Sequence, residues 1–507
     1  MSVFHHLPLG RRIPDRPHAV SVSLPTLRDL IGYEEKDPAV VRQISLGYPR
    51  FVLHPCLRQL AAHLAARHGL AGATLWLTVS ARAAAALAEH LARTPAGRGA
   101  RLAPWSADGV HGVAHPENSE VFGEAKAFLQ NTGMFLGSRA AEEALVRLGV
   151  LPQAEPEPLF AGDAAAEIRR VLRRALPAAG DADLLPACTG MNAIYAAFRA
   201  VSELQAARGR TTWVQLGWLY RDTIAILKRM TPDPARDYVH LPDVFDLAAL
   251  ERWCAERGDR LAGIVAETPT NPLIQTPDVP ALAALARRHG AKLILDPSIA
   301  SPFCVDVLGH ADLVVNSLTK FAASDGDIIA GLVAVNPAAP DAAALRAGLV
   351  RWLEPVYARD LARLAAQIGD YEAVVRTLNA STPRIAAFLE SHPRVQRVYW
   401  PRSPESRANF ARIARGPDAV GGMLSFTLKT PLAPFYDAVR LPKGPSFGMK
   451  NTLISPFIYI AHYDLVTTAA GRAELAASGI EPDLLRLSVG CEPVDDIIAT
   501  LAEALER

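Results

Sequence analysis

The stretch Asn316-Ser317-Leu318-Thr319-Lys320-Phe321 follows a mostly apolar run, residues 311–315, that predicts a buried strand. Upstream, a second apolar run at residues 293–295 is closed by Asp296. In an α/β protein the carboxyl ends of parallel strands lie along one edge of the sheet, where ligands bind. We therefore expect the carboxylate of Asp296 and the amine of Lys320 to converge on one small ring.

An acid and an amine placed in this way suit pyridoxal phosphate. This cofactor needs a lysine that holds it as a Schiff base, and a carboxylate that keeps its ring nitrogen protonated so that the ring withdraws electrons. Lys320 and Asp296 are the candidates for these two tasks. Ser317 and Thr319 flank the lysine, and their hydroxyl groups are candidate hydrogen-bond donors to the phosphate.

A further phosphate site is predicted at Thr189-Gly190-Met191-Asn192. The glycine precedes an apolar helical pattern at positions 194, 197, 198 and 201, which would leave backbone N–H groups free to bind an anion at the helix N-terminus. Taken singly, short motifs of this kind also fit an exposed lysine and a turn-forming or capping aspartate. Their common order along the chain favours the cofactor site.

Four ordered motifs carry a resemblance to a known family. They are Glu267-Thr268-Pro269-Thr270-Asn271-Pro272, residues 295–302, residues 317–321 and residues 486–496. In order and spacing these motifs resemble the core of the cystathionine gamma-synthase family of Cys/Met-metabolism enzymes. Residues 18–25, 32–34, 216–223 and Gly47-Tyr48-Pro49-Arg50-Phe51 resemble the fungal-type branch of that family, whose members carry a long extra N-terminal region. The resemblance covers nearly the whole chain.

The resemblance implies a role for each matching residue. Lys320 is implied as the Schiff-base lysine and Asp296 as the partner of the ring nitrogen. The other implied cofactor contacts are the phosphate-binding positions Gly190, Met191, Ser317 and Thr319, together with Asn271 near the phenolic oxygen and Ser298. Arg486, helped by Ser446, is implied to hold the α-carboxylate of the substrate, a task that suits the planar fork of a guanidinium.

Two departures from the family pattern concern aromatic residues. Leu216 stands where the family usually has a tyrosine that stacks on the cofactor and assists proton transfer. Trp218 or Tyr220 is a candidate to supply this aromatic face, although aromatic residues near strands are commonly core residues. The usual Tyr-Ser-Arg segment, which reaches the phosphate of the neighbouring subunit, is present only as Gly137-Ser138-Arg139.

Arg139 therefore has two interpretations. It is a candidate phosphate-binding residue by the resemblance, or an exposed helix arginine that pairs with Glu142 or Glu143 on the same helix.

Composition excludes several other classes of protein. Half of the 507 residues are hydrophobic, which predicts a large core in two or three domains. The 53 basic and 52 acidic side chains nearly cancel, so we expect no nucleic-acid partner. The five cysteines form no CxxC pair, so neither a disulfide framework nor a metal site is expected. No signal peptide or membrane span is expected, and the protein is predicted to be soluble and cytoplasmic.

The apolar patterns divide the chain into three regions. Residues 1–120 form an extra N-terminal region, helical around 57–66 and 81–92, with a boundary in the Gly-, Pro-, Ser- and His-rich residues 95–119. Residues 121–340 alternate strands and helices, which predicts a mostly parallel sheet in a large cofactor-binding domain. Residues 341–507 begin with a long helical segment, 341–378, and form a smaller C-terminal α/β domain.

The expected strands of the large domain are 212–215, 263–266, 292–295, 312–315 and 331–335, with a helix at 279–288. Strand-like residues 422–428 and 484–489 belong to the smaller domain, and the second of these runs carries Arg486. The resemblance implies the aspartate aminotransferase-like fold, fold type I, with the active site in the cleft between the two domains.

The activity that the resemblance implies is replacement at the γ carbon of an O-acyl-L-homoserine by L-cysteine, to give cystathionine in transsulfuration and methionine biosynthesis. Lys320 would be both covalent anchor and general base. A cystathionine or methionine lyase and an O-acylhomoserine sulfhydrylase are alternatives on the same fold, and a catalytically weak, cofactor-binding regulatory protein is an alternative of another class. The resemblance also implies a homodimer or homotetramer that takes small amino-acid substrates.

Overall fold

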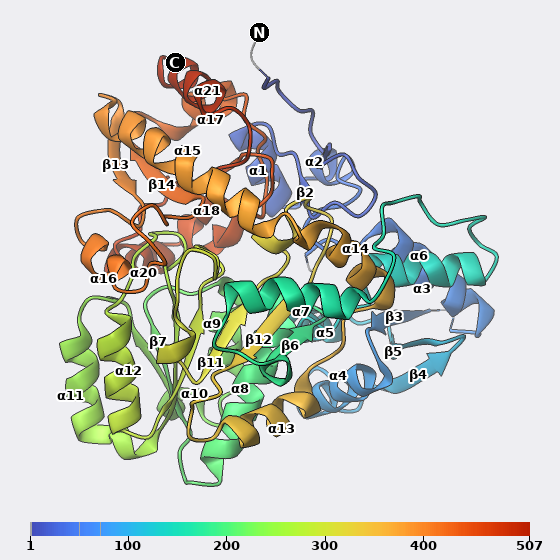
Figure 1. Ribbon diagram of the computed structural model, residues 1–507. Helices are drawn as coiled ribbons and strands as arrows, with labels where there is room; N and C mark the ends of the chain where they lie inside the picture. The colour runs from blue at the N-terminus through green and yellow to red at the C-terminus, as the bar shows by residue number, and fades with distance from the viewer. Residues whose placement is uncertain (1–2, 50, 71) are drawn as a thin grey trace.

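A mixed β-sheet forms the centre of the molecule (Figure 1). The computed structural model describes residues 3–49, 51–70 and 72–507, and within them seven strands join in the order β6-β12-β11-β10-β9-β7-β8. The strands from β11 to β8 are parallel, whereas β12 is antiparallel to both neighbours. The bounds are Leu184–Ala187 (β6), Thr212–Leu216 (β7), Tyr238–Leu241 (β8), Leu261–Glu267 (β9), Lys292–Asp296 (β10), Leu313–Asn316 (β11) and Gly331–Val335 (β12). The predicted mostly parallel sheet is confirmed.

Helices cover both faces of this sheet, which explains why its strands read as continuous apolar runs. In β10, Leu293 and Leu295 pack in one core with the apolar side of α12 (Val279–Arg288), which has the predicted bounds. Ile294, between them, packs in the opposite core with α8 (Gly190–Ala206). Further helices around the sheet are α5 (Ser119–Thr132), α7 (Ala164–Ala175), α9 (Arg221–Met230), α10 (Pro234–Asp237) and α11 (Leu247–Arg257).

The C-terminal region builds a second, antiparallel sheet in the order β13-β14-β16-β15. Its strands are Val395–Tyr399 (β13), Met423–Leu428 (β14), Leu453–Pro456 (β15) and Leu485–Ser488 (β16). Its helices after residue 400 are Arg407–Ala411 (α16), Leu432–Ala438 (α17), Phe457–Ala461 (α18), Tyr463–Thr467 (α19), Ala469–Ala477 (α20) and Val494–Leu505 (α21). The two strand-like runs predicted here are therefore confirmed as β14 and β16.

The long helical segment predicted at 341–378 is divided into α13 (Ala342–Trp352), α14 (Ala358–Ile368) and α15 (Tyr371–Ser391). Pro355 lies in the first break, where proline cannot donate a helical hydrogen bond, and Gly369 ends α14. The apolar periodicity continues through both breaks, which is why the sequence reads as one helix.

The N-terminal region contains a small antiparallel sheet, β3-β5-β4, beside the central one. The predicted helices are confirmed as α3 (Pro55–Arg67) and α4 (Ala81–Arg93), and α6 (Ser138–Arg147) packs on α3. Residues 95–119, expected as a boundary, instead contain β4 (Ala103–Ala107) and β5 (Val110–Pro116), and β5 pairs with β3 (Ala73–Thr78). Pro104 and Ser106 interrupt β4, and His111, Gly112 and His115 interrupt β5, so neither strand shows the apolar pattern that would have revealed it.

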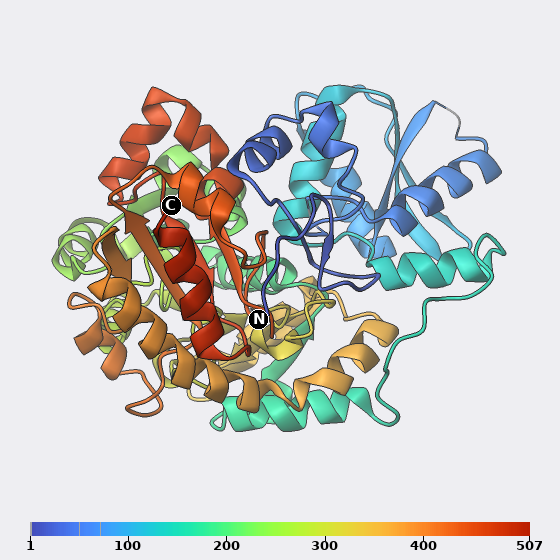
Figure 2. The ribbon, with the colours of Figure 1, turned by 90° about the horizontal axis from the view of Figure 1, so that it is seen from above.

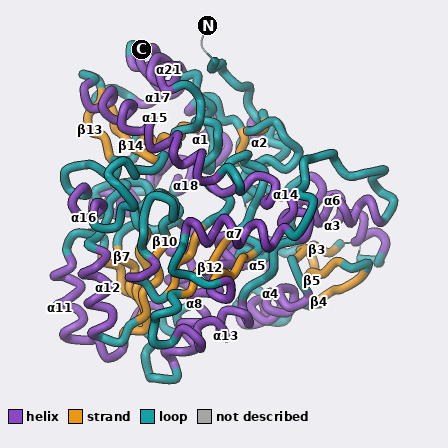
Figure 3. The backbone as a smooth tube through the Cα atoms, in the orientation of Figure 1, coloured by secondary structure: helices purple, strands orange, loops and turns teal. Residues whose placement is uncertain are grey.

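The first part of the chain lies against the C-terminal region. It comprises β1 (Arg12–Ile13), β2 (Ser21–Val22), α1 (Leu27–Glu34) and α2 (Pro38–Val41), and α1 contacts both α17 and α18 (Figure 2). Figure 3 shows how helices surround the strands of the central sheet. Among the described residues, no helix combines the length and apolar character that crossing a membrane requires.

Candidate active site

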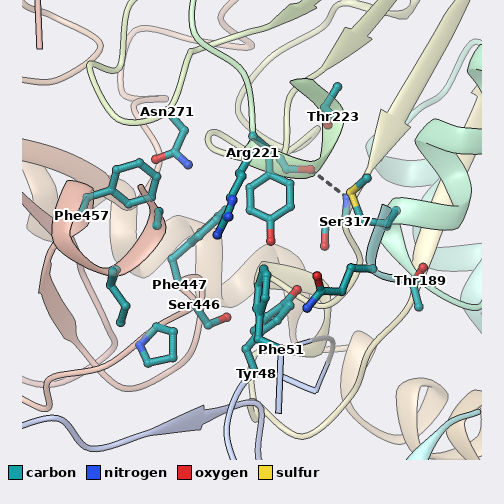
Figure 4. A pocket seen from close by; sticks show the side chains of 18 of the residues that line it. Tyr48, Phe51, Thr189, Arg221, Thr223, Asn271, Ser317, Ser446, Phe447 and Phe457 are labelled. Atoms are coloured by element: carbon teal, nitrogen blue, oxygen red, sulfur yellow. Dashed lines mark hydrogen bonds between the residues drawn. The ribbon is translucent and has the colours of Figure 1, made fainter. Parts of the chain in front are cut away.

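A cavity of about 440 Å³ opens at the carboxyl ends of β10 and β11, and all three regions of the chain line it (Figure 4). Tyr48 and Phe51 enter from the N-terminal region, Ser317 directly follows β11 of the central sheet, and Phe457 comes from the C-terminal region. A volume of this size is that of a small-molecule site. The predicted site residues found in its wall are Gly190, Met191, Tyr220, Asn271, Asp296, Ser298, Ser317, Lys320, Ser446 and Arg486.

Lys320 is buried in this cavity, directly after β11 and its loop. Its Nζ donates to the hydroxyl of Ser446 at 3.1 Å and to the hydroxyl of Tyr48 at 3.4 Å. The same Nζ lies 4.7 Å from the ring centroid of Tyr48 and 4.6 Å from that of Phe447. Ring faces at these distances stabilise an ammonium, so aromatic rings and hydroxyl groups together hold the lysine in place.

Asp296 ends β10 and turns its carboxyl group into the cavity. Burial raises the pKa of this carboxyl to about 6, although hydrogen bonds from Ser298 and the charge of Lys320 oppose that rise. The backbone N–H of Ser298 donates to the carboxylate at 2.8 Å. A buried carboxylate gains most from a cationic partner, and the protonated nitrogen of a pyridine ring is such a partner.

Ser298 fixes the spacing between the acid and the amine. Its hydroxyl oxygen accepts the backbone N–H of Ser317 at 2.8 Å and the side-chain amide of Asn316 at 3.4 Å. These two residues lie at the end of β11, whereas Ser298 follows β10, so the hydrogen bonds join the loops that carry Asp296 and Lys320. The role of Ser298 in this arrangement is to position the two loops.

The N-terminus of α8 forms an anion cradle beside the lysine. Thr189 caps the helix, and its hydroxyl accepts the backbone N–H of Asn192 at 2.8 Å. A Cβ atom at Gly190 would lie 3.0 Å from the Oγ of Ser317, so a glycine allows the helix to approach the lysine loop this closely. Free N–H groups at a helix N-terminus bind phosphate. Cradle, amine and carboxyl group together fit pyridoxal phosphate.

Arg486, in β16, is buried in the same cavity and is held by polar and aromatic groups. Its guanidinium donates to the side-chain oxygen of Asn271 at 3.2 Å and to the carbonyl of Ser446 at 2.9 Å. It also lies 4.5 Å from the ring centroid of Phe457. Burial lowers the pKa of Arg486 to about 10, so the group remains cationic at neutral pH and suits a carboxylate.

Tyr220, and not Trp218, is the aromatic residue of residues 216–223 that lines the cavity. It stands at the N-cap of α9, and its backbone N–H donates to the carboxylate of Glu267. Trp218 packs instead in an apolar cluster with Leu273 and with several residues of the C-terminal region. Leu216 is fully buried inside β7 and does not line the cavity.

Two further predicted residues lie outside the cavity wall. The hydroxyl of Thr319 is buried and exchanges hydrogen bonds with the backbone of Ala330, so it does not line the cavity. Arg139 is buried, contrary to the expected exposed arginine, and its guanidinium binds Glu157 at 2.7 Å and Asp360 at 3.0 Å. Neither side chain lines the cavity.

Several cavity residues carried no predicted role. Glu267 is quoted in the motif at 267–272, and burial, followed by the charge of Asp296, raises its pKa well above the usual range. Tyr48 and Phe51 stand in Gly47-Tyr48-Pro49-Arg50-Phe51, of which Arg50 lies outside the described residues. The only feature of the sequence that pointed to Tyr48 and Phe51 was the resemblance of this motif to the fungal-type branch. The charged groups at the mouth are Glu34, Lys36, Lys126 and Arg221.

Comparisons with known proteins identify the family of the chain. The model of the family described as Cys/Met metabolism PLP-dependent enzyme matches residues 169–506. The chain is 42% identical over 497 residues to L-2-amino-4-chloropent-4-enoate dechlorinase/desaturase of Streptantibioticus cattleyicolor, covering 98% of both chains. It is 27% identical over 617 residues to cystathionine gamma-synthase of Neurospora crassa, again covering 98% of both.

The fold is similar to that of solved structures of cystathionine gamma synthase. Cystathionine gamma synthase of Xanthomonas oryzae pv. oryzae, in complex with aminoacrylate and cysteine, matches with a TM-score of 0.57 and 26% identity, over 68% of this chain and 86% of that one. The predicted family, fold type and cofactor are thereby confirmed. The chain belongs to the Cys/Met metabolism PLP-dependent enzymes.

Proposed function

We propose that this enzyme removes a leaving group from the γ carbon of a small L-amino acid, and that the leaving group is chloride. The observation that carries the proposal is the apolar wall beside Lys320 and Arg486, formed by the rings of Phe51, Phe447 and Phe457. A chlorinated hydrocarbon side chain suits such a wall, because apolar surface leaves water there. The full-length similarity to a dechlorinase/desaturase supports the same choice.

In this proposal each residue of the site has a separate role in the reaction. Bound pyridoxal phosphate supplies an electron-withdrawing ring that stabilises negative charge on the carbon next to the amino group. Arg486 holds the α-carboxylate, Asp296 keeps the ring nitrogen protonated, and Lys320 takes the proton from the α carbon. Because Arg486 and Lys320 both contact Ser446, the carboxylate holder and the proton acceptor have a fixed separation.

The reaction balances without an oxidant. In an L-2-amino-4-chloro acid the chlorine is on the γ carbon, and departure of chloride with its bonding electrons, together with one proton from carbon, removes HCl and adds one unsaturation. The proton leaves through Lys320, and the chloride leaves through the mouth of the cavity.

The test uses the purified protein loaded with pyridoxal phosphate and incubated with L-2-amino-4-chloropent-4-enoate. We expect one free chloride for each amino acid consumed and an amino-acid product lighter by HCl, measured by ion chromatography and mass spectrometry. Lys320→Ala, treated in the same way, should release none. A loaded wild-type protein that binds the substrate and leaves its chlorine in place would contradict the proposal.

A second candidate is γ-replacement on an O-acyl-L-homoserine with L-cysteine. The charged mouth favours it, because Lys36, Lys126 and Arg221 face Glu34 there and offer partners for the carboxylate and ammonium of a second amino acid. Burial, followed by the charges of Lys36 and Arg221, lowers the pKa of Lys126. Cystathionine formed from O-succinyl- or O-acetyl-L-homoserine only when cysteine is present would select this candidate, whereas α-ketobutyrate formed from cystathionine would select a lyase.

We also propose a homodimer or homotetramer, on the strength of the family relationship. Light scattering of the loaded protein tests this, and a fully active monomer would contradict it.

A further inference from the structure

Glu267 is a buried carboxyl group in the wall of the cavity, and it takes no part in the proposed reaction. It ends β9, which lies beside β10, and in the parallel register of these strands residue 267 is the partner of Asp296. Side chains of partner residues in neighbouring strands point to the same face of a sheet. Two acids therefore stand side by side at the edge of the sheet, and both line the cavity.

The two acids have different partners. Asp296 accepts the backbone N–H of Ser298 at 2.8 Å, and the charge of Lys320 favours its ionised form. Glu267 accepts the backbone N–H of Tyr220, which is uncharged, and within the described part of the chain it forms no ion pair. Because a buried charge without an ionic partner is costly, and two adjacent carboxylates repel each other, the proton of the pair belongs on Glu267.

Arg486 shows the same lack of an ionic partner, although it is a buried cation. Its guanidinium donates to the side-chain oxygen of Asn271 and to the carbonyl of Ser446, and none of the carboxylates that the structure describes pairs with it. Burial lowers the pKa of Arg486, and the charges of Tyr220 and Glu267 oppose that shift, so Glu267 lies close enough to act on the arginine. An ionised Glu267 would therefore compete with the carboxylate of an amino acid for Arg486, whereas a neutral one leaves the cation available.

We infer that Glu267 is a positioning residue that keeps its proton at neutral pH, so that Asp296 alone carries negative charge and Arg486 stays free to bind a carboxylate. Burial, followed by the charge of Asp296, raises the pKa of Glu267 well above its usual range, which agrees with this arrangement. A neutral carboxyl group still accepts the N–H of Tyr220, so it also holds the start of α9 at the cavity. The inference rests on the roles proposed for Asp296 and Arg486, and it is independent of the leaving group.

The other ionisable groups that face Glu267 stay in place when a glutamine replaces it. They are Asp296 from β10, Tyr220 from α9, Arg486 from β16 and Lys320 from the loop after β11. The remaining neighbour of β9 is β7, whose five residues include no ionisable side chain. Four further charged groups lie at the mouth of the cavity: Glu34, Lys36, Lys126 and Arg221. A change in Glu267→Gln therefore reports on the proton of this one carboxyl group.

The first experiment detects the proton directly. Ordinary carboxyl groups are ionised at pH about 7, so the carbonyl stretch of a carboxylic acid is distinctive in the infrared spectrum of the protein loaded with pyridoxal phosphate. We expect subtraction of the Glu267→Gln spectrum from that of wild type to leave one carboxylic-acid band. Glu354→Gln is the matched control, because Glu354 is also buried but lies outside the cavity and pairs with Arg82 at 2.9 Å. Its subtraction should leave a carboxylate band, and a carboxylate band for Glu267 as well would overturn the inference.

Asp296→Asn tests the link between the two acids. Without the neighbouring negative charge, Glu267 should release its proton at a lower pH, so we expect the midpoint of the carboxylic-acid band to fall by about one pH unit or more. All samples are saturated with pyridoxal phosphate, and thermal unfolding checks that each variant is folded. An unchanged midpoint would show that Asp296 does not hold the proton on Glu267 and would refute this part of the inference.

The second experiment follows the availability of Arg486. The absorbance change of the loaded protein measures the binding of L-alanine, and ethylamine, which lacks only the carboxylate, is the control ligand. We expect wild type and Glu267→Gln to bind L-alanine equally at pH about 7. If Glu267 were ionised there, the glutamine variant would bind L-alanine about 10- to 100-fold more tightly and ethylamine unchanged, because a competing charged hydrogen bond to Arg486 would be lost. That result would also overturn the inference.

Glu267→Ala separates the positioning role from the proton. Alanine leaves the N–H of Tyr220 without its acceptor, whereas the amide oxygen of glutamine replaces the carboxyl oxygen. We expect Glu267→Ala to raise the dissociation constant for pyridoxal phosphate by about tenfold and Glu267→Gln to leave it unchanged. Equal constants for the alanine variant and wild type would contradict the positioning role. None of these measurements requires turnover, so their outcome is separate from that of chloride release.

Discussion

Lys320 and Arg486 are held by the same residue, since Ser446 accepts the amine on its hydroxyl at 3.1 Å and the guanidinium on its carbonyl at 2.9 Å. Ser446 adopts a φ of 79°, in the left-handed region that a residue with a side chain rarely occupies. This backbone turns the carbonyl toward the arginine while the hydroxyl faces the lysine. One residue therefore positions both the guanidinium that we propose binds the substrate carboxylate and the amine that we propose acts as base, and backbone strain at a functional site is a recognised way to achieve such positioning.

Reduction with borohydride should attach the cofactor to Lys320 and to no other lysine of the cavity. Lys36 and Lys126 line the same cavity, which makes them internal controls. We expect peptide mass spectrometry of the loaded and reduced protein to find the cofactor on the peptide that contains residue 320, and Lys126→Ala to give the same result. Modification at Lys36 or Lys126 in place of Lys320 would show that the amine has been assigned wrongly.

Replacing the carboxylate with an amide in Asp296→Asn should lower kcat by about 10²–10³-fold, since an amide cannot keep the ring nitrogen protonated and a preorganised charge is lost. The measurement is steady-state turnover at saturating pyridoxal phosphate. A cofactor analogue methylated on the ring nitrogen carries a permanent positive charge and should restore part of the activity in Asp296→Asn. Equal activities of variant and wild type would rule out this role.

Arg486→Lys should weaken amino-acid binding by about 10- to 100-fold, because charged hydrogen bonds contribute about 1.5–3 kcal/mol and a lysine does not reproduce the planar fork. The measurement is the substrate-induced change in absorbance of the loaded protein. A primary amine without a carboxylate serves as the control ligand, and it should bind wild type and variant equally. A parallel loss for both ligands would point to a damaged cavity and not to a lost carboxylate contact.

Acid should destabilise the fold through His462. This imidazole is buried with its ring centroid 5.1 Å from that of Trp218, and burial, followed by the charges of Arg221 and Lys228, lowers its pKa to about 3 from 6.5. The unfolded chain takes up this proton near pH 6.5, whereas the folded chain does not until about pH 3. The free energy of unfolding therefore falls as the pH drops below 6.5, by about 2 kcal/mol at pH 5.

Urea unfolding at about pH 7 and pH 5 measures this loss, and other buried histidines contribute to the total. The difference between wild type and His462→Phe isolates one residue. We expect the phenylalanine variant, which suits the surrounding aromatic cluster, to lose less stability on acidification, and His5→Gln, at an exposed position, to behave as wild type. Identical pH dependence in wild type and His462→Phe would contradict the prediction.

The central sheet could be predicted from the sequence because its strands are buried on both faces. Leu293, Ile294 and Leu295 form an uninterrupted apolar run that ends in an acid, and such a run has few other interpretations. The same reasoning fails for β4, which is largely exposed, and for β5, which is mostly buried but whose apolar residues are interrupted by His111, Gly112 and His115. An uninterrupted apolar run therefore determined which strands could be recognised.

The site could be predicted where a residue with a suitable functional group stands at or just after the end of a predicted strand, as Asp296 and Lys320 do. The direction of each side chain in a loop is harder to predict from the sequence. Ser317 and Thr319 were both expected to bind phosphate, but Ser317 lines the cavity and Thr319 donates to the backbone of Ala330. Tyr48 could not be placed at all, because 272 residues separate it from Lys320 and no periodicity reports a contact across that distance. Its motif was recognisable, but its position was a property of the tertiary fold.

The N-terminal segment and β16 bring residues 48 and 486 to one cavity, so the two ends of the chain meet where the cofactor binds. A contact this distant in sequence forms only after the chain has been synthesised almost to its end, and loop closure makes it slow. Any ligand bound there stabilises both ends at once, because it binds the folded state alone. A cofactor bound in this cavity therefore also stabilises the contact between the two ends of the polypeptide.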